Sequence, residues 1–282
     1  MTFLYDLWSK QSAHSTPRDQ LFVFDCDKTL ITGDLGEASL RRALNQRWII
    51  SHEAWWRHLD LGEVATSNER AAWRRAYERD LNRDTHEVDH ADTLGDELWR
   101  AYERLCEVDV YSAYIYAARF AYQRTPAEVH SLTRAALQGD QTTELRPVME
   151  RFVNQLQDLG GQVWVVSSSH IDVVRVIAEY YNIPMHHVIG IDFVRDSHNS
   201  GSSERLVRPV PIDTGKVDAL FAHHAAQPAL MVGDSFYDLP LMATAQQRFL
   251  IDHHTSADLT VAARALDAEI IDHELLERYT VH

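Results

Sequence analysis

Residues 22–34 read FVFDCDKTLITGD, an apolar run that ends in two carboxylates. Asp25 and Asp27 lie two residues apart, and Thr29 follows two residues later. Two neighbouring carboxylates can divide the roles of nucleophile and general acid. They can also be no more than the polar end of a buried strand. The partners that the rest of the chain supplies decide between these interpretations.

Polar residues also follow other short apolar runs that are typical of strands buried on both faces. The run QVWVVS ends in Ser167, and the run ALMVG leads into Asp234 and, four residues later, Asp238. Lys216 begins a helix-like segment just before the second of these runs. Ligands of open α/β sheets bind beyond the carboxyl ends of the strands, so we expect these side chains to converge.

Four carboxylates at one place would repel one another and take up protons unless a cation held them. Mg²⁺ is the natural candidate, because it prefers oxygen ligands and pairs with phosphate. A lysine and a hydroxyl then suit phosphate oxygens. One carboxylate can attack phosphorus to give an aspartyl-phosphate, and a second can protonate the leaving oxygen. The pattern predicts an enzyme that transfers the phosphoryl group of a phosphate ester.

The order of these residues resembles the motifs of the haloacid dehalogenase superfamily of phosphotransferases. Its first motif, D-x-D-x-T, is matched by residues 25–29, and its second, an apolar strand ending in Ser or Thr, by Ser167. Its lysine is matched by Lys216 and its G-D-x-x-x-D by residues 233–238. The four motifs span essentially the whole expected core. The resemblance implies a phosphatase with a Rossmann-like α/β core and a parallel sheet.

The resemblance also implies roles for the matched residues. Asp25 is the expected nucleophile and Asp27 the general acid and base. Ser167 and Lys216 are expected to hold the transferring phosphoryl group, with Thr29 and Ser168 as further substrate contacts, although the serines of this SSSH turn can instead cap the following helix. The implied Mg²⁺ ligands are the side chains of Asp25 and Asp234 and the backbone carbonyl of Asp27, with Asp238 in support.

The elements that must position these residues are of two kinds. The core strands are expected at 21–25, 162–167, 187–190 and 229–233, with helices at 147–159 and 170–181. Pro147 at a helix start and Gly160-Gly161 just past its end fit the usual pattern of helix termini. The segment 196–203 is expected to be a turn between two extended pieces.

Residues 41–143 are helical in pattern and rich in Trp, Tyr, Arg and Glu. Capping boxes at 66–69 and 125–128 each predict the start of a helix, and the second helix is expected to end at Gly139. We therefore expect a catalytic core formed by residues 1–40 and 144–282, with residues 41–143 inserted as an all-helical cap. Family members with a helical cap, including phosphoserine phosphatases, carry their insertion between the same two motifs.

A narrower resemblance is to bacterial phosphorylcholine phosphatases, in residues 34–40 (DLGEASL) and 103–120. In that family a glutamate shortly after the nucleophile faces the trimethylammonium group of the substrate, and Glu37 holds the matching place. This predicts a small-molecule ester with an ammonium-bearing leaving group, of the phosphocholine, phosphoserine or phosphoethanolamine type. The alternatives are a phosphotransferase or phosphomutase that uses another acceptor, and a binding protein that kept the fold without the activity.

Composition limits the partners. The chain of 282 residues has a formal net charge of −15, which argues against binding to nucleic acid or an anionic membrane. No apolar stretch is long enough to cross a bilayer. The N-terminal segment lacks the pattern of a signal peptide, so we expect a cytoplasmic protein with Cys26 and Cys106 reduced.

Histidines offer a weaker metal signal. Residues 86–90 (HEVDH) fit the H-E-x-x-H zinc pattern, but polar flanks favour an exposed helix surface instead. The histidine pairs at 186–187, 223–224 and 253–254 are adjacent, so the two rings of each pair point apart. We expect surface or packing roles for them.

Overall fold

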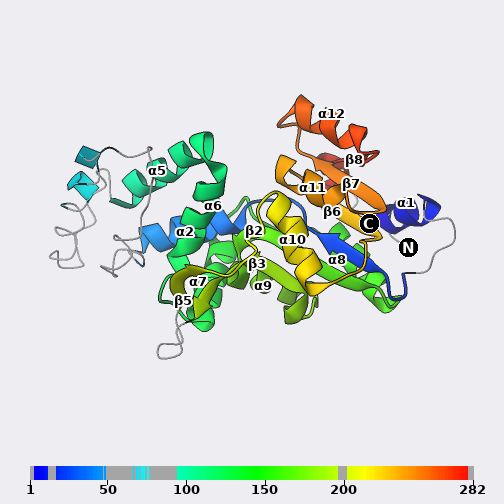
Figure 1. The fold of residues 1–282 in the computed structure, drawn as a ribbon, viewed down its shortest axis with the longest axis horizontal. Coiled ribbons are helices and arrows are strands. Elements are labelled where there is room, and N and C mark those ends of the chain that lie inside the picture. The colour runs from blue at the N-terminus through cyan, green and yellow to red at the C-terminus, as the bar shows by residue number, and fades with distance from the viewer. Residues whose placement is uncertain are drawn as a thin grey trace.

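The computed structural model describes residues 3–11, 17–46, 94–195 and 202–278, together with 48, 66, 68, 69, 71–73 and 75. Within these ranges, parallel strands form a six-stranded sheet in the order β3-β2-β1-β6-β7-β8 (Figure 1). The strands are β1 Leu21–Phe24, β2 Gln162–His170, β3 Val188–Ile191, β6 Leu230–Gly233, β7 Gln247–Asp252 and β8 Glu269–Asp272. The expected α/β fold with a parallel sheet is confirmed.

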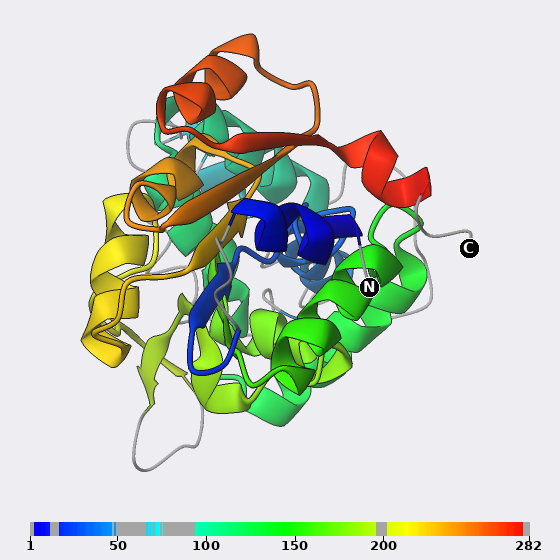
Figure 2. The same cartoon turned by 90° about the vertical axis from the view of Figure 1, so that its right-hand side faces the viewer.

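Helices cover both faces of the sheet because side chains alternate along each strand. Phe22 and Phe24 of β1 belong to one buried cluster, and Leu21 and Val23 belong to another. The first cluster is covered by α1 Phe3–Gln11, α8 Pro147–Asp158, α9 Ile171–Tyr180 and α13 His273–Arg278. The second is covered by α10 Thr214–His223, α11 Leu239–Met242 and α12 Ala257–Ala265. Figure 2 shows this layering, with α8 and α13 to the right of the strands and α10 to the left.

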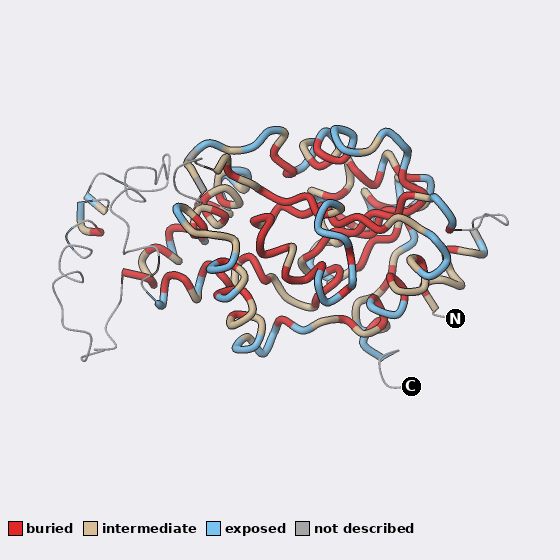
Figure 3. The backbone as a smooth tube through the Cα atoms, turned by 90° about the horizontal axis from the view of Figure 1, so that it is seen from below, coloured by how far each residue is buried: buried red, intermediate tan, exposed pale blue. Residues whose placement is uncertain are grey.

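Further helices lie beyond one end of the sheet (Figure 1). They are α2 Leu35–Asn45, α5 Leu94–Val108, α6 Val110–Ala118 and α7 Pro126–Gly139. Their buried side chains, among them Leu98 and Tyr116, belong to the same apolar cluster as Phe24 of β1. Figure 3 shows buried residues both in the strands and in these helices. The division into a core and an inserted cap at 41–143 stays a prediction.

Local predictions are confirmed at several helix ends. The Thr125 side chain and the Glu128 side chain form the reciprocal capping box that begins α7, and Thr66 and Glu69 exchange the same bonds. Helix α8 begins at Pro147, and Gly160 beyond its end takes a positive φ of 85°. The HEVDH segment lies outside the described residues.

Two strands and a small hairpin complete the architecture. The sequence reading did not identify β7 or β8, which extend the sheet beyond β6. An antiparallel pair is formed by β4 Phe193–Arg195 and β5 Ser202–Leu206. The turn expected at 196–203 is too long, because residues 202 and 203 belong to β5; residues 196–201 lie outside the described part. Cys26 and Cys106 are both free thiols. No helix in the described ranges has the length and apolar character needed to span a bilayer.

Candidate active site

The carboxyl ends of β1, β2 and β6 meet at one edge of the sheet, because these neighbouring strands are parallel. Asp25 directly follows β1, and its backbone N–H donates to the Val232 carbonyl of β6 at 2.9 Å. A cavity of about 70 Å³ opens at this edge. Its lining includes Asp25, Asp27, Ser167, Ser168, Lys216 and Asp234. Topology thus brings these predicted residues together.

Lys216, near the start of α10, lies between two carboxylates. Its Nζ donates to Asp25 Oδ1 at 2.7 Å and to Asp238 Oδ1 at 2.6 Å, and all three side chains are buried. Burial lowers the pKa of Lys216, but the charges of Asp238 and Asp25 outweigh this effect and raise the pKa above its ordinary value. Lys216 therefore stays charged. It binds Oδ1 of Asp25 and does not contact Oδ2.

Asp238 has a supporting role in this geometry. Its Oδ2 accepts from the Ser235 hydroxyl at 2.7 Å and from the backbone N–H groups of Ser235 at 3.0 Å and Asp234 at 3.2 Å. A Cβ on Gly233 would lie 2.6 Å from Asp238 Cγ, so only glycine permits this approach. The spacing G-D-x-x-x-D therefore positions Asp234 through Asp238.

The carboxylates of Asp25, Asp234 and Asp238 each offer an oxygen, and these atoms lie within 4.8 Å of one another. Burial raises the pKa of Asp25 to about 7, although the adjacent Lys216 opposes the shift. Burial, together with the charges of Asp238 and Asp25, raises the pKa of Asp234 well above its ordinary value. A bound cation would restore the ionised forms, so the donor set fits a metal ion.

Asp27 is held differently. Its Oδ1 accepts from the Leu35 N–H at 2.7 Å, and its Oδ2 accepts from the Ser169 hydroxyl at 2.5 Å. Burial raises the pKa of Asp27, and these two hydrogen bonds partly oppose the shift. A Cβ on Gly36 would meet Ser169 Oγ at 2.5 Å, so α2 can approach the serine only with glycine there. A fixed carboxyl group with a raised pKa suits proton donation.

Of the other residues predicted to contact the substrate, Ser167 and Ser168 line the cavity and Thr29 does not. Ser167 is buried, and its hydroxyl accepts from the Ser169 N–H at 3.1 Å. Ser168 lines the cavity, but its hydroxyl donates to the Pro211 carbonyl at 2.9 Å. Thr29 is buried outside the cavity lining, and its hydroxyl has no hydrogen-bond partner among the described residues. The structure therefore does not bring Thr29 into the cavity.

Helix α9 is capped by His170 rather than by any of the three serines before it. The His170 Nδ1 accepts from the Asp172 N–H at 3.1 Å. The serines are thereby free of the capping role that the sequence left open. Ser169 instead bonds to Asp27, a contact that sequence reasoning missed.

Glu37 lies in the first turn of α2, just beyond the cavity. Asp34 caps this helix by accepting from the Glu37 N–H at 2.8 Å, and the Tyr102 hydroxyl of α5 donates to Glu37 Oε1 at 2.8 Å. Asp34 lines both the small cavity and a neighbouring cleft of about 590 Å³, which Glu37 also lines. Asp34 was not among the residues predicted from the sequence. Burial raises the pKa of Asp34 well above its ordinary value.

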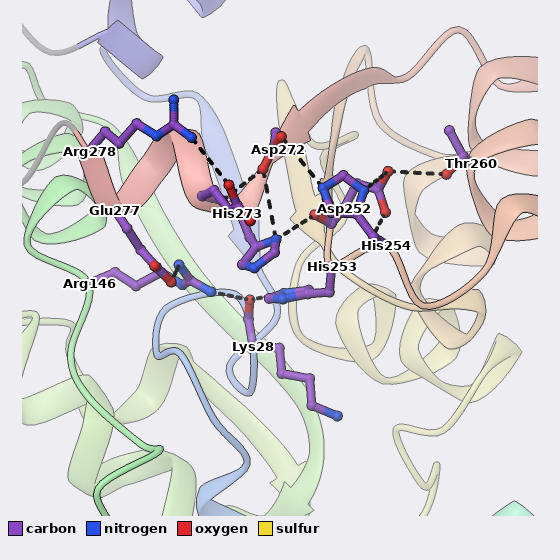
Figure 4. Close-up of polar contacts among 11 residues, drawn as sticks. Lys28, Arg146, Asp252, His253, His254, Thr260, Asp272, His273, Glu277 and Arg278 are labelled. Carbon is purple, nitrogen blue, oxygen red and sulfur yellow. Dashed lines mark hydrogen bonds and ion pairs between the residues drawn. The ribbon is translucent and has the colours of Figure 1, made fainter.

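Three residues distant in sequence hold the loop that follows Asp27. His253 Nε2 lies 2.9 Å from the Lys28 carbonyl, and Arg146 approaches the same oxygen at 3.5 Å from the other side (Figure 4). Arg146 also donates to the Ile31 carbonyl at 3.3 Å, and the Tyr181 hydroxyl donates to the Leu30 carbonyl. Lys28 itself takes a positive φ of 54°. These contacts hold Lys28 in a left-handed backbone conformation that few residues other than glycine adopt.

The neutral form of His253 suits this contact. Burial lowers its pKa to about 4, so the ring is uncharged at neutral pH. A carbonyl oxygen can only accept, so Nε2 carries the proton in this contact. No sequence pattern marks Arg146, Tyr181 or His253 as partners of a loop more than one hundred residues away.

Comparison with known proteins agrees with this architecture. A family model described as haloacid dehalogenase-like hydrolase matches residues 20–246, so the chain belongs to that family and is a hydrolase. The resemblance found in the sequence is confirmed. A comparison with curated protein sequences gives no match.

Several solved structures share the fold. A conserved protein of unknown function from Anaerococcus prevotii is 18% identical, with 96% of this chain and 95% of that chain covered and a TM-score of 0.67. A protein of unknown function from Bordetella pertussis is 16% identical, with coverages of 91% and 99% and a TM-score of 0.62. A phosphoserine phosphohydrolase-like protein from Francisella tularensis is 12% identical, with coverages of 94% and 100% and a TM-score of 0.54. These likenesses concern the fold.

Replacing Arg146 by methionine tests the loop contacts. The change keeps the aliphatic bulk but leaves the buried Ile31 carbonyl without its side-chain donor, so the free energy of unfolding should fall by about 1–3 kcal/mol. Displacement of the loop should lower kcat roughly tenfold. Glu277→Gln is the matched control, because Glu277 is an exposed ion-pair partner of Arg146 at 3.6 Å and should change little. Urea unfolding and steady-state kinetics measure both effects; equal, small effects of the two variants would contradict a role for Arg146 in holding the loop.

Proposed function

We propose that this hydrolase is an Mg²⁺-dependent phosphomonoesterase that cleaves a small-molecule phosphate ester through an aspartyl-phosphate on Asp25. The observation that carries the proposal is the Lys216 ammonium between Asp25 and Asp238, at the edge where Asp27 is independently fixed. The similarity in fold to a phosphoserine phosphohydrolase-like protein supports it.

Asp25 is the nucleophile. Lys216 binds Oδ1, which leaves Oδ2 to attack phosphorus, and the bond between phosphorus and the ester oxygen breaks. Asp27 gives its proton to that leaving oxygen and becomes a carboxylate. It then takes a proton from water, whose oxygen attacks phosphorus and breaks the bond to Asp25. Inorganic phosphate leaves, and both side chains return to their starting forms.

The other residues hold the phosphoryl group and the cation. Lys216 and Ser167 bind phosphoryl oxygens. The carboxylates of Asp25 and Asp234 and the backbone carbonyl of Asp27 would hold Mg²⁺, with Asp238 in support. When bound, Mg²⁺ offsets the negative charge that would otherwise keep a carboxylate away from phosphate.

Selectivity among phosphate esters comes from contacts with the leaving group, since every ester has the same phosphoryl group. Residues 41–143 form a cap in this proposal, and their Tyr102 orients the half-buried Glu37 beside the cavity. Asp34 adds a second carboxyl group where the cavity meets the cleft. This acidic border favours a leaving group with an ammonium, of the choline, ethanolamine or serine type.

Asp25→Asn removes the nucleophile while keeping the shape of the side chain. Hydrolysis of small phosphate esters in the presence of Mg²⁺ should be abolished, with the circular dichroism spectrum unchanged. Phosphate release measured across a panel of esters tests this. Normal phosphate release from the variant would refute the mechanism.

Glu37→Gln tests the substrate class separately. Losing a partly desolvated charge contact should lower kcat/KM for an ammonium-bearing ester roughly ten- to a hundredfold, and should affect p-nitrophenyl phosphate far less. Glu103→Gln is the matched control, since Glu103 is an exposed carboxylate of α5 that accepts from Trp99 at 2.7 Å. Equal losses of kcat/KM on both substrates would mean that Glu37 does not recognise the charge of the leaving group.

A further inference from the structure

A second group of metal-binding side chains lies at the ends of β7 and β8, outside the cavity. The parallel register pairs Asp252 with Asp272, the last residues of the two strands. The residues that follow, His253-His254 after β7 and His273 after β8, are therefore brought side by side (Figure 4). Sequence alone hides this arrangement, because the two strands are joined through α12.

The two adjacent histidines after β7 point to different partners. His253 faces the catalytic loop, where it contacts the Lys28 carbonyl. His254 turns the other way, and its Nε2 lies 3.5 Å from Asp272 Oδ2. Both rings also pack against His273, with ring centroids 4.8 Å away for His253 and 5.6 Å for His254. The expectation that adjacent rings point apart is wrong for His186 and His187, whose ring centroids lie 4.3 Å apart.

His254, Asp272 and His273 each offer one ligand atom, and the three atoms lie within 4.8 Å of one another. His273 Nδ1 lies 3.9 Å from Asp272 Oδ1 and 3.1 Å from the Asp252 carbonyl oxygen. The group is accessible, since 56% of the His254 side chain and 47% of the Asp272 side chain are exposed. Two imidazoles and one carboxylate form a donor set that binds zinc and related ions and leaves positions open for water.

The remaining polar atoms of two of these ligands have partners that orient them. His254 Nδ1 lies 3.5 Å from Asp252 Oδ2, which also accepts from the Thr260 hydroxyl at 3.4 Å. Asp272 Oδ1 accepts from the Glu274 N–H at 2.8 Å. A carboxylate on the second nitrogen of a histidine is the support that metal-bound imidazoles characteristically have.

We propose that His254, Asp272 and His273 form a second metal site, which takes a divalent transition-metal ion of the Zn²⁺ type. Imidazole nitrogens distinguish it from the all-oxygen set around Asp25, which suits Mg²⁺. An ion held there would join the ends of β7 and β8 at the edge of the sheet. The site does not depend on the phosphatase function, since its ligands lie outside the cavity lining.

Calorimetric titration of Zn²⁺ into the tag-free full chain tests the proposal. Mg²⁺ in excess keeps the carboxylates around Asp25 occupied. The wild-type protein should show a saturable Zn²⁺ site that weakens at least about tenfold in His254→Ala and in Asp272→Asn, because each removes one of three protein ligands. The visible spectrum of Co²⁺ bound in place of Zn²⁺ gives a second readout, which the same substitutions should remove.

Two variants serve as matched controls. His223→Ala removes another exposed histidine, which lies beside Trp164, and Glu274→Gln neutralises an adjacent carboxylate while keeping its backbone N–H. Both should bind Zn²⁺ as the wild type does. Absence of Zn²⁺ binding to the wild-type protein, binding that withstands either ligand substitution, or equal weakening in the controls would overturn the proposal.

Discussion

The contact of one lysine with two buried carboxylates governs the carboxyl edge of this sheet. Lys216 neutralises part of the charge of Asp25 and Asp238, but Asp234 lies in the same group and Asp27 and Asp34 lie nearby. Among the described residues, Lys28 and Lys216 are the cationic side chains that line the cavity. More carboxylates than cations line the cavity. Burial raises the pKa of Asp25 and Asp234, and the neighbouring charge of Asp238 raises both further. Such a site gains from a divalent cation and from anions that the cation brings with it.

The fold supplies the rigidity that this charge distribution demands. Asp25 extends the central strand β1, whose neighbours β2 and β6 contribute Ser167 and Asp234 at the same edge. The loop after Asp27 then reverses through a positive φ at Lys28 and is held by Arg146, Tyr181 and His253. Carboxylates that repel one another can stay close only where the backbone beneath them cannot move apart.

Sequence reasoning brought the residues of the candidate site to one edge of the sheet because they follow strongly apolar strands at fixed spacings. It missed β7 and β8, which begin with the partly or fully exposed residues Gln247, Arg248 and Glu269, so neither strand has the continuous apolar pattern of β1. It also missed Ser169 and Arg146, because their partners lie 142 and 115 or more residues away and no local pattern encodes such contacts. Thr29 was selected as part of a motif, yet it faces the interior.

Chemical trapping of the phosphorylated enzyme tests the central claim most directly. Acid quenching of a reacting mixture, reduction with borohydride and mass spectrometry of the digested chain identify the residue that carried the phosphoryl group. Reduction of an aspartyl-phosphate converts that aspartate to homoserine, and we expect the modification at Asp25. Modification of another residue, or steady hydrolysis with no trapped residue at any stage of the reaction, would contradict a mechanism in which Asp25 attacks phosphorus.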